Sequence, residues 1–235
     1  MSKLFAPLVL TIATVFSGCA VMAAPARVEP PLPTYLLGSP QIRRELKIPH
    51  ATALKIRHAL DMIAESGRGG IVDGEQAAKQ RAFARSVNPQ ALHREIAGYL
   101  SAAQKQRLRE IGYQMAGPHI YGNAYLTQRI GLSKSQLQRL LAVDQKEGKR
   151  YARGVRALVE ANRSWRGTLD PQRHRAKYAA YNRKFQRLGE IKNDSIARAV
   201  NHTLTPAQKA RWKMLLGKPF NRRNLTRDIR IVPID

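Results

Sequence analysis

A five-residue pattern, Leu-(Ser/Thr)-x-x-Gln, constrains this chain more than any other feature, because it is a helix start that recurs at 100–104, 132–136 and 204–208. In a capping box the hydroxyl side chain accepts a hydrogen bond from the backbone N–H three residues later, and the Gln there binds the backbone N–H of the cap. The third copy also has Pro206 at the first helical position, where no donor is needed. We therefore predict structural helix caps from three pairs: Ser101 with Gln104, Ser133 with Gln136, and Thr205 with Gln208.

A fourth, degenerate copy stands at 48–52, where the hydroxyl residue and the Gln are both replaced. The segment that leads into it, SPQIRRELKIP at 39–49, is similar to NAYLTQRIGLS at 123–133, which leads into the 132–136 copy. The other two copies, at 100–104 and 204–208, are each followed by a helical pattern that ends on Gly and Pro. The four copies form two pairs, which predicts an internal duplication. The expected parts are a first helical unit at 39–122, a second at 123–220 with a long basic hairpin, and a C-terminal tail at 221–235.

Apolar residues recur at helical spacing over most of the chain. Over 137–165, a spacing of four and three residues selects nine positions, of which six are apolar or aromatic and Asp144, Gly148 and Asn162 are the exceptions. A turn at 166–172 separates this pattern from a second one at 178–200, so the two helices should pack as an antiparallel hairpin. The expected fold is all-α, with helical hairpins, long antiparallel helices and two tandem units.

The first residues are typical of a secretion leader. Lys3 is followed by an apolar run at 4–16, which is short for a membrane span and has the length of a signal-peptide core. Cleavage near 21–24 would release a soluble chain, whereas FSGC at 16–19 resembles a lipobox, with Phe where Leu is usual, and would place a lipid on Cys19. We expect a signal peptide at 1–23, a Pro-rich tether at 24–38 and a periplasmic protein, either soluble or lipid-anchored.

Paired motifs of this kind, in an exported, basic and helical chain, resemble the LTXXQ-motif family of exported bacterial proteins, which are Spy/CpxP-like. The resemblance covers most of residues 39–220. It implies hairpin units that pair into a cradle, ATP-independent chaperone activity or envelope-stress sensing, and in one branch a response to metals. Family members carry two motifs per chain, so four copies imply a fused pair of Spy-like units.

The chain is strongly basic, with 41 Lys and Arg against 16 Asp and Glu and a formal net charge of +25. Residues 129–227 hold 25 of these bases and only 6 carboxylates. A merely soluble surface usually mixes the two signs, so this imbalance indicates a surface directed at anions. The candidate residues for binding an anionic partner lie on the two long helices and the turn between them: Lys146, Lys149, Arg150, Arg153, Arg156, Arg163, Arg166, Arg173, Arg175, Arg183, Lys184 and Arg187.

No catalytic constellation is present in the sequence. Cys19 is part of the leader or a lipid anchor, SGRGG at 66–70 lacks the Lys-Ser/Thr ending of a phosphate loop, and the carboxylates are scattered. The six histidines have no metal-binding spacing, although His50 and His58 lie eight residues apart on roughly one helix face. We therefore expect no enzyme activity, no cofactor and no bound metal.

These observations support three functional hypotheses. The first is a chaperone-like holdase or envelope-stress protein that attracts unfolded or acidic proteins by charge and holds them by apolar contact. The second is a structural protein of the envelope that binds acidic polymers or an anionic membrane surface. The third, which the residues support least, is a metal-responsive sensor. Export disfavours genomic nucleic acid as the natural partner.

Overall fold

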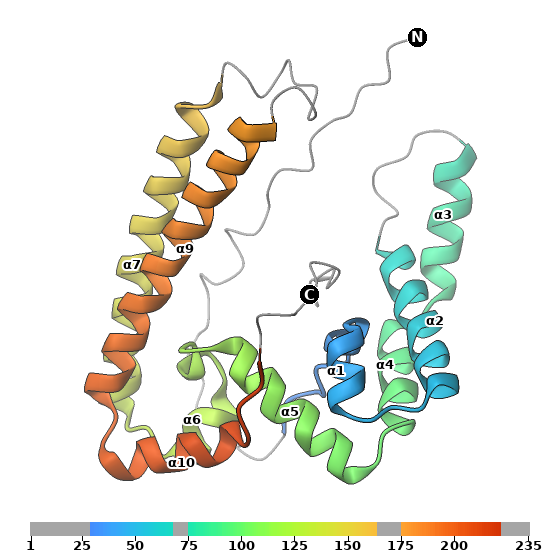
Figure 1. Ribbon diagram of the computed structural model, residues 1–235, viewed down its shortest axis with the longest axis horizontal. Coiled ribbons are helices and arrows are strands. Elements are labelled where there is room, and N and C mark those ends of the chain that lie inside the picture. Colours follow the sequence, from blue (N-terminus) through green and yellow to red (C-terminus); the bar gives the residue numbers. More distant parts are fainter. Residues whose placement is uncertain (1–28, 68–74, 164–174, 222–235) are drawn as a thin grey trace. The chain divides into compact units, whose positions relative to one another are not determined.

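The computed structural model describes residues 29–67, 75–163 and 175–221, and these contain nine α-helices, two 3-10 helices and no strand (Figure 1). The all-helical prediction is therefore confirmed. Among the described helices, none combines the length and the apolar character that crossing a bilayer requires. The expected signal peptide, Cys19 and all of the expected tail except Asn221 lie outside the described residues.

The described residues fall into two compact units, which we call the N-terminal unit (29–117 and 210–221) and the hairpin unit (118–209). This division differs from the expected one, which placed the boundary after residue 122 and assigned 210–220 to the second unit. The apolar side chains explain the difference: Phe220 is buried in the core of the N-terminal unit, whereas Ile120 is buried beyond the boundary, within the hairpin unit.

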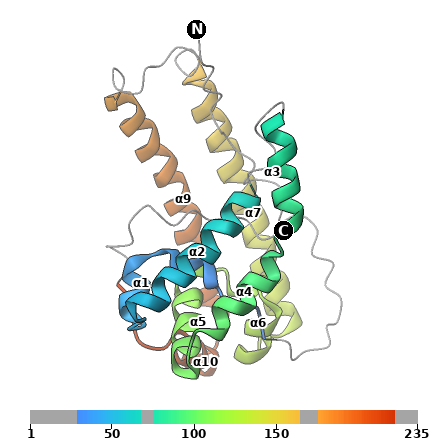
Figure 2. The same ribbon diagram turned by 90° about the vertical axis from the view of Figure 1, so that its right-hand side faces the viewer.

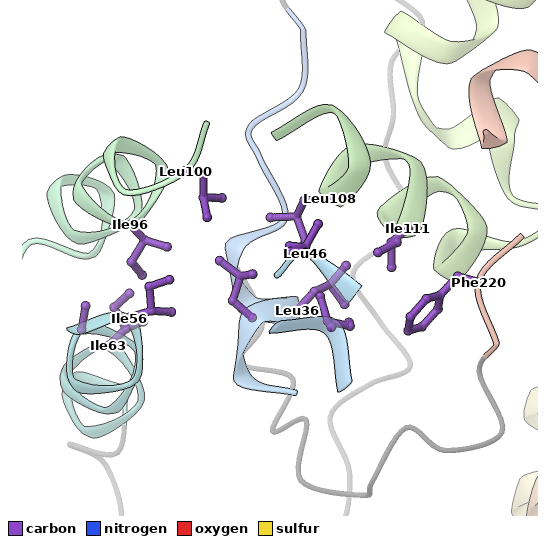
Figure 3. Packing of buried hydrophobic residues seen from close by; sticks show 12 residues of the cluster. Leu36, Leu46, Ile56, Ile63, Ile96, Leu100, Leu108, Ile111 and Phe220 are labelled. Carbon is purple, nitrogen blue, oxygen red and sulfur yellow. The ribbon is translucent and has the colours of Figure 1, made fainter. Parts of the chain in front are cut away.

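The core of the N-terminal unit is a single cluster of aliphatic side chains. Ile56 on one helix faces Ile96 on another, and Leu108 and Ile111 approach Leu36 (Figure 3). Asn88 begins one of these helices by accepting a hydrogen bond from Ala91 N at 3.1 Å. The elements of the unit are η1 (Thr34–Gly38), α1 (Pro40–Glu45), α2 (His50–Ser66), α3 (Glu75–Ser86), α4 (Pro89–Gly98) and α5 (Ala102–Ala116).

Residues 34–38, predicted as the end of an extended tether, instead form η1, and that part of the prediction is wrong. Leu36 and Leu37 are 1% and 0% exposed, respectively, and both belong to the core cluster. Prolines stop at Pro33, and the two adjacent leucines bury enough apolar surface to hold the segment against the helices. Residues 24–28 of the expected tether lie outside the described residues.

The hairpin unit is dominated by two long helices that lie side by side (Figures 1 and 2). Asp144 meets Lys192, and further along the first helix Tyr151 meets Phe185, which is earlier in the second, so the helices are antiparallel. The elements are η2 (Ile120–Gly122), α6 (Ala124–Ile130), α7 (Lys134–Glu160), α9 (Arg175–Thr203) and α10 (Pro206–Leu216), whose residues from 210 onwards belong to the N-terminal unit.

Both halves of the chain have the same order of local features. A 3-10 helix and a short helix lead to a residue with positive φ, Lys47 at 50° or Gly131 at 79°, just before a long helix. The helices that end each half, α5 and α10, are followed by Gly117 and Gly217 with φ of 62° and 61°. The parallel concerns local features, and the internal duplication stays a prediction.

Candidate functional site

The candidate basic residues lie on the outside of the hairpin unit. Ten of the twelve are described, and Arg166 and Arg173 fall in the undescribed 164–174 segment. All ten described residues are exposed: Lys146, Lys149, Arg150, Arg153 and Arg156 on α7, Arg163 just after it, and Arg175, Arg183, Lys184 and Arg187 on α9.

Helical geometry separates these charges from the surface that joins α7 and α9. Val155 is buried and Tyr151 is half-buried, with its ring 6.1 Å from that of Phe185. Arg153 lies two residues from both Tyr151 and Val155, which at about 100° per residue places it on the opposite side of the helix. The described positions of the seam predicted over 137–165 are buried or half-buried, and the seam contacts α9 at Asp144 and Tyr151, while the basic residues face away from it. Trp165, the last position of the predicted seam, lies outside the described residues.

The carboxylates of the two helices are distributed differently from the bases. α7 has seven Lys and Arg against three Asp and Glu, and α9 has seven against two. Thirteen of these fourteen bases are exposed, the exception being Lys192, whereas only three of the five carboxylates are: Glu160, Glu190 and Asp194. Asp144 instead pairs with Lys192 at 3.3 Å, and the Glu147 side chain is only 12% exposed. The excess of bases over carboxylates is therefore greater among the exposed residues of the two helices than among all of their residues.

The charges on α7 are also poorly compensated by one another. Lys146, Lys149, Arg150, Arg153 and Arg156 make five pairs at i,i+3 or i,i+4 spacing, all of like sign. Such pairs destabilise a helix by about 0.2–0.5 kcal/mol each. Of the five, only Arg150 has a carboxylate of the described residues within 4.0 Å, namely Glu147 at 3.9 Å. An anionic partner would relieve this repulsion.

A polar cluster that the sequence analysis did not identify lies where the chain enters the hairpin. His119 Nδ1 is 3.0 Å from Tyr121 Oη and 4.0 Å from Asp144 Oδ1, and His119 Nε2 is 3.2 Å from Asn193 Oδ1. The segment before η2 is thereby joined to both α7 and α9. Burial, and then the charge and hydrogen bond of Asp144, raise the pKa of the Tyr121 phenol. The sequence signal was Asp144, the one charged residue among the nine positions of the seam.

The histidines with metal-binding potential are not brought together. His50 and His58 are both exposed on α2, and His93 contacts Thr34 Oγ1 at 2.6 Å. Burial lowers the pKa of His93. Across the described ranges, no group of three or more His, Cys, Asp or Glu side chains is placed to hold a metal ion.

The three capping boxes expected from the sequence are present. Ser101 and Gln104 begin α5, Ser133 and Gln136 begin α7, and Thr205 and Gln208 begin α10. Their Gln side chains also reach other helices, which the motif alone did not predict. Gln104 Nε2 donates to Leu46 O at 2.9 Å, and Gln136 and Gln208 bind each other across the hairpin unit. The motif therefore holds helices together as well as starting them.

Comparison of the chain with models of known protein families, with curated proteins and with solved structures found no match.

Proposed function

We propose that this chain is an exported binding protein that holds an acidic polymer against the outer surface of α7 and α9. The observation that carries the proposal is the distribution of charge on these helices, with thirteen exposed bases and three exposed carboxylates. A surface of one sign speeds the encounter with a polyanion and makes the affinity depend strongly on salt. Asp144 and Glu147 are turned towards the interior, so their carboxylates are withdrawn from the basic surface.

The apolar residues favour an acidic polymer over an unfolded protein as the partner of the hairpin. Holding an unfolded chain requires exposed apolar surface to which its own apolar segments can bind. Among the described residues the exposed large apolar side chains are Leu54, Phe83 and Met214, and none of them lies on α7 or α9. The hairpin surface therefore offers charge without apolar contact.

The same three residues support a holdase as the second candidate function. Leu54 and Met214 are 54% and 72% exposed, and all three residues belong to the N-terminal unit. A chaperone of the LTXXQ-motif kind would use such side chains after an electrostatic encounter. The test is the aggregation of an unfolding client: a holdase would slow it, and Leu54→Gln with Met214→Gln would weaken that effect. Unchanged aggregation in the presence of the wild-type protein would eliminate this candidate.

The acidic-polymer proposal is tested by neutralising the α7 surface. A variant with Gln at 146, 149, 150, 153 and 156 should bind heparin on the order of 100-fold more weakly at low salt, because each base near a polyanion contributes up to about 1 kcal/mol. The matched control removes five exposed bases from the N-terminal unit, and its charge change is identical: Arg44, Lys55, Arg57, Arg85 and Arg94 to Gln. Equal losses in the two variants would show that only net charge matters and would refute the proposal.

Export is a separate part of the proposal and has its own test. Mass spectrometry of the mature N-terminus distinguishes three outcomes: a lipidated Cys19, a free N-terminus near Ala24, and an uncleaved chain. The first two agree with export to the periplasm, and the first adds an anchor in the membrane. An uncleaved chain recovered from the cytoplasm would contradict export while leaving the binding proposal to the heparin experiment.

A further inference from the structure

Ten of the exposed bases of the hairpin unit form two separate sets, five on each long helix. We call the first set the α7 edge and the second the α9 edge. The α7 edge consists of Lys146, Lys149, Arg150, Arg153 and Arg156, and the α9 edge consists of Lys177, Arg183, Lys184, Arg187 and Arg198. Each edge holds two Lys and three Arg, so the two can be compared directly.

The α7 edge points away from α9. Asp144 and Tyr151 mark the inward side of α7, because they contact Lys192 and Phe185 of α9. Lys146 is two residues after Asp144, and Arg153 is two residues after Tyr151, so both lie roughly half a turn away from the seam.

The α9 edge points away from α7 for the same reason. Ile196 and Val200 are buried, and Arg198 lies midway between them in sequence. Arg183 precedes Phe185 by two residues, and Phe185 packs against Tyr151 of α7. Because the two helices are joined along their inward sides, their basic edges face in opposite directions. A flat anionic surface could contact one edge at a time, whereas polymer strands could occupy both.

From these opposed edges we infer that the hairpin binds two strands of an acidic polysaccharide at once, one along each edge, and so bridges them. The inference rests on the proposed function, since it requires that the basic surface binds an acidic polymer. Beyond the proposed function, the inference specifies that two strands bind, that the polymer is a polysaccharide, and that the protein therefore cross-links it.

The aromatic residues of the hairpin favour a polysaccharide over a nucleic acid. Binding of single-stranded nucleic acid relies on aromatic side chains that stack on the bases. The described aromatic residues of α7 and α9 are Tyr151, Tyr178, Tyr181 and Phe185, and all four are half-buried instead of exposed among the bases. Sulfate and carboxylate groups need only Lys and Arg, which both edges supply.

The two edges should differ in strength. No carboxylate is exposed on α7 over 139–159, whereas Glu190 and Asp194 are exposed on α9. Glu190 also pairs with Arg187 at 3.1 Å and so competes with an anionic ligand for that guanidinium. The strand on the α7 edge should therefore be held more tightly than the strand on the α9 edge.

The experiment is a titration of the full chain with a short sulfated oligosaccharide. The α7 edge runs from Lys146 to Arg156, ten steps along the helix or about 15 Å at 1.5 Å per step, so a probe of about that length cannot wrap around both helices. Isothermal titration should give two bound oligosaccharides for the wild type and one for each variant in which a single edge is changed to Gln. The site that survives in the α7-edge variant should be at least a few-fold weaker than the one that survives in the α9-edge variant.

Light scattering with long heparin provides the second readout. The wild type should cross-link the polymer and scatter strongly, while both single-edge variants bind it without cross-linking. One oligosaccharide per wild-type chain, cross-linking that survives in a single-edge variant, or sites that persist when both edges are changed would each overturn the inference. A wild type that binds one oligosaccharide keeps the proposed function, whereas one that binds none overturns both.

Two controls secure the interpretation. Circular dichroism should show unchanged helix content in each variant, because Gln is a good helix former and the substitutions remove repulsion between like charges. Single-stranded DNA of equal charge should compete less well than the sulfated oligosaccharide. Stronger competition by the DNA would overturn the assignment of a polysaccharide.

Discussion

The side chains of Gln136 and Gln208 exchange two hydrogen bonds with each other, at 2.9 and 3.0 Å. Each amide nitrogen also donates to a backbone carbonyl just before the other motif, Gln136 to Thr203 O at 2.8 Å and Gln208 to Gly131 O at 2.6 Å. Each amide oxygen accepts in addition from the backbone N–H of its own cap. All four hydrogen-bonding positions of both amides are therefore filled in a buried site.

This reciprocal pair should make the two motifs energetically dependent on each other. Gln136→Ala or Gln208→Ala should lower the free energy of unfolding by about 2–3 kcal/mol, because each leaves buried polar groups without partners. The double variant should cost less than the sum of the two by about 1 kcal/mol, measured by urea denaturation. Gln104→Ala, whose side chain is half-buried and binds Leu46 O, is the matched control and should cost about 1 kcal/mol. Strict additivity of the two single changes would contradict the prediction.

Changing one partner of the Asp144–Lys192 ion pair should destabilise the protein more than changing both partners together. Asp144→Leu leaves Lys192 half-buried without its carboxylate, so the free energy of unfolding should fall by about 1–3 kcal/mol. Adding Lys192→Leu should restore part of that loss. The exposed Arg187–Glu190 pair is the control, and Glu190→Gln should change stability by less than about 1 kcal/mol. Equal losses of stability from Asp144→Leu and Glu190→Gln in thermal unfolding would contradict a role for the half-buried position of Asp144.

Two glycines of α7 should respond in different ways to the same substitution. A Cβ at Gly154 would lie 2.9 Å from Leu188 Cδ2, whereas one at Gly148 would meet nothing within 4 Å. Gly148→Ala should stabilise the protein by up to about 1 kcal/mol, since Ala is the better helix former. Gly154→Ala should give a stability about 1 kcal/mol lower than Gly148→Ala, because Leu188 must move. Chemical denaturation of both variants checks the difference, and equal stabilisation would refute close packing at Gly154.

Tyr121 should make the stability of the protein fall with rising pH in alkaline solution. Burial and Asp144 raise the pKa of this phenol above its ordinary 10.0, so the native state keeps a proton that the unfolded chain loses. The stabilisation is complete below pH 10 and is lost as the pH rises towards the pKa of the folded state. Melting temperatures of Tyr121→Phe should therefore decline less steeply above pH 10 than those of the wild type. A parallel decline in the two proteins would contradict the raised pKa.

The position of the basic surface shows how much of the site could be predicted. Its residues and their exposure followed from the spacing of Arg153 and its neighbours relative to the apolar seam, because helical periodicity is a property of the local sequence. The seam spacing already placed Asp144 on the inward side, but its pairing with Lys192 and the burial of the Glu147 side chain did not follow, since both depend on the packing of the folded unit. The one-signed character of the surface is therefore partly a tertiary property.

By itself, the sequence determined the features that depend on residues a few positions apart: the all-helical fold, the capping boxes at Ser101, Ser133 and Thr205, and the seam on α7. Tertiary structure decided what brings distant residues together. It folded Leu36 and Leu37 of the expected tether into the core, placed Phe220 there as well, and joined Gln136 to Gln208. Local hydrogen bonds and helical periodicity operate within one or two turns, whereas burial and long-range pairing depend on which apolar faces meet when the whole chain packs.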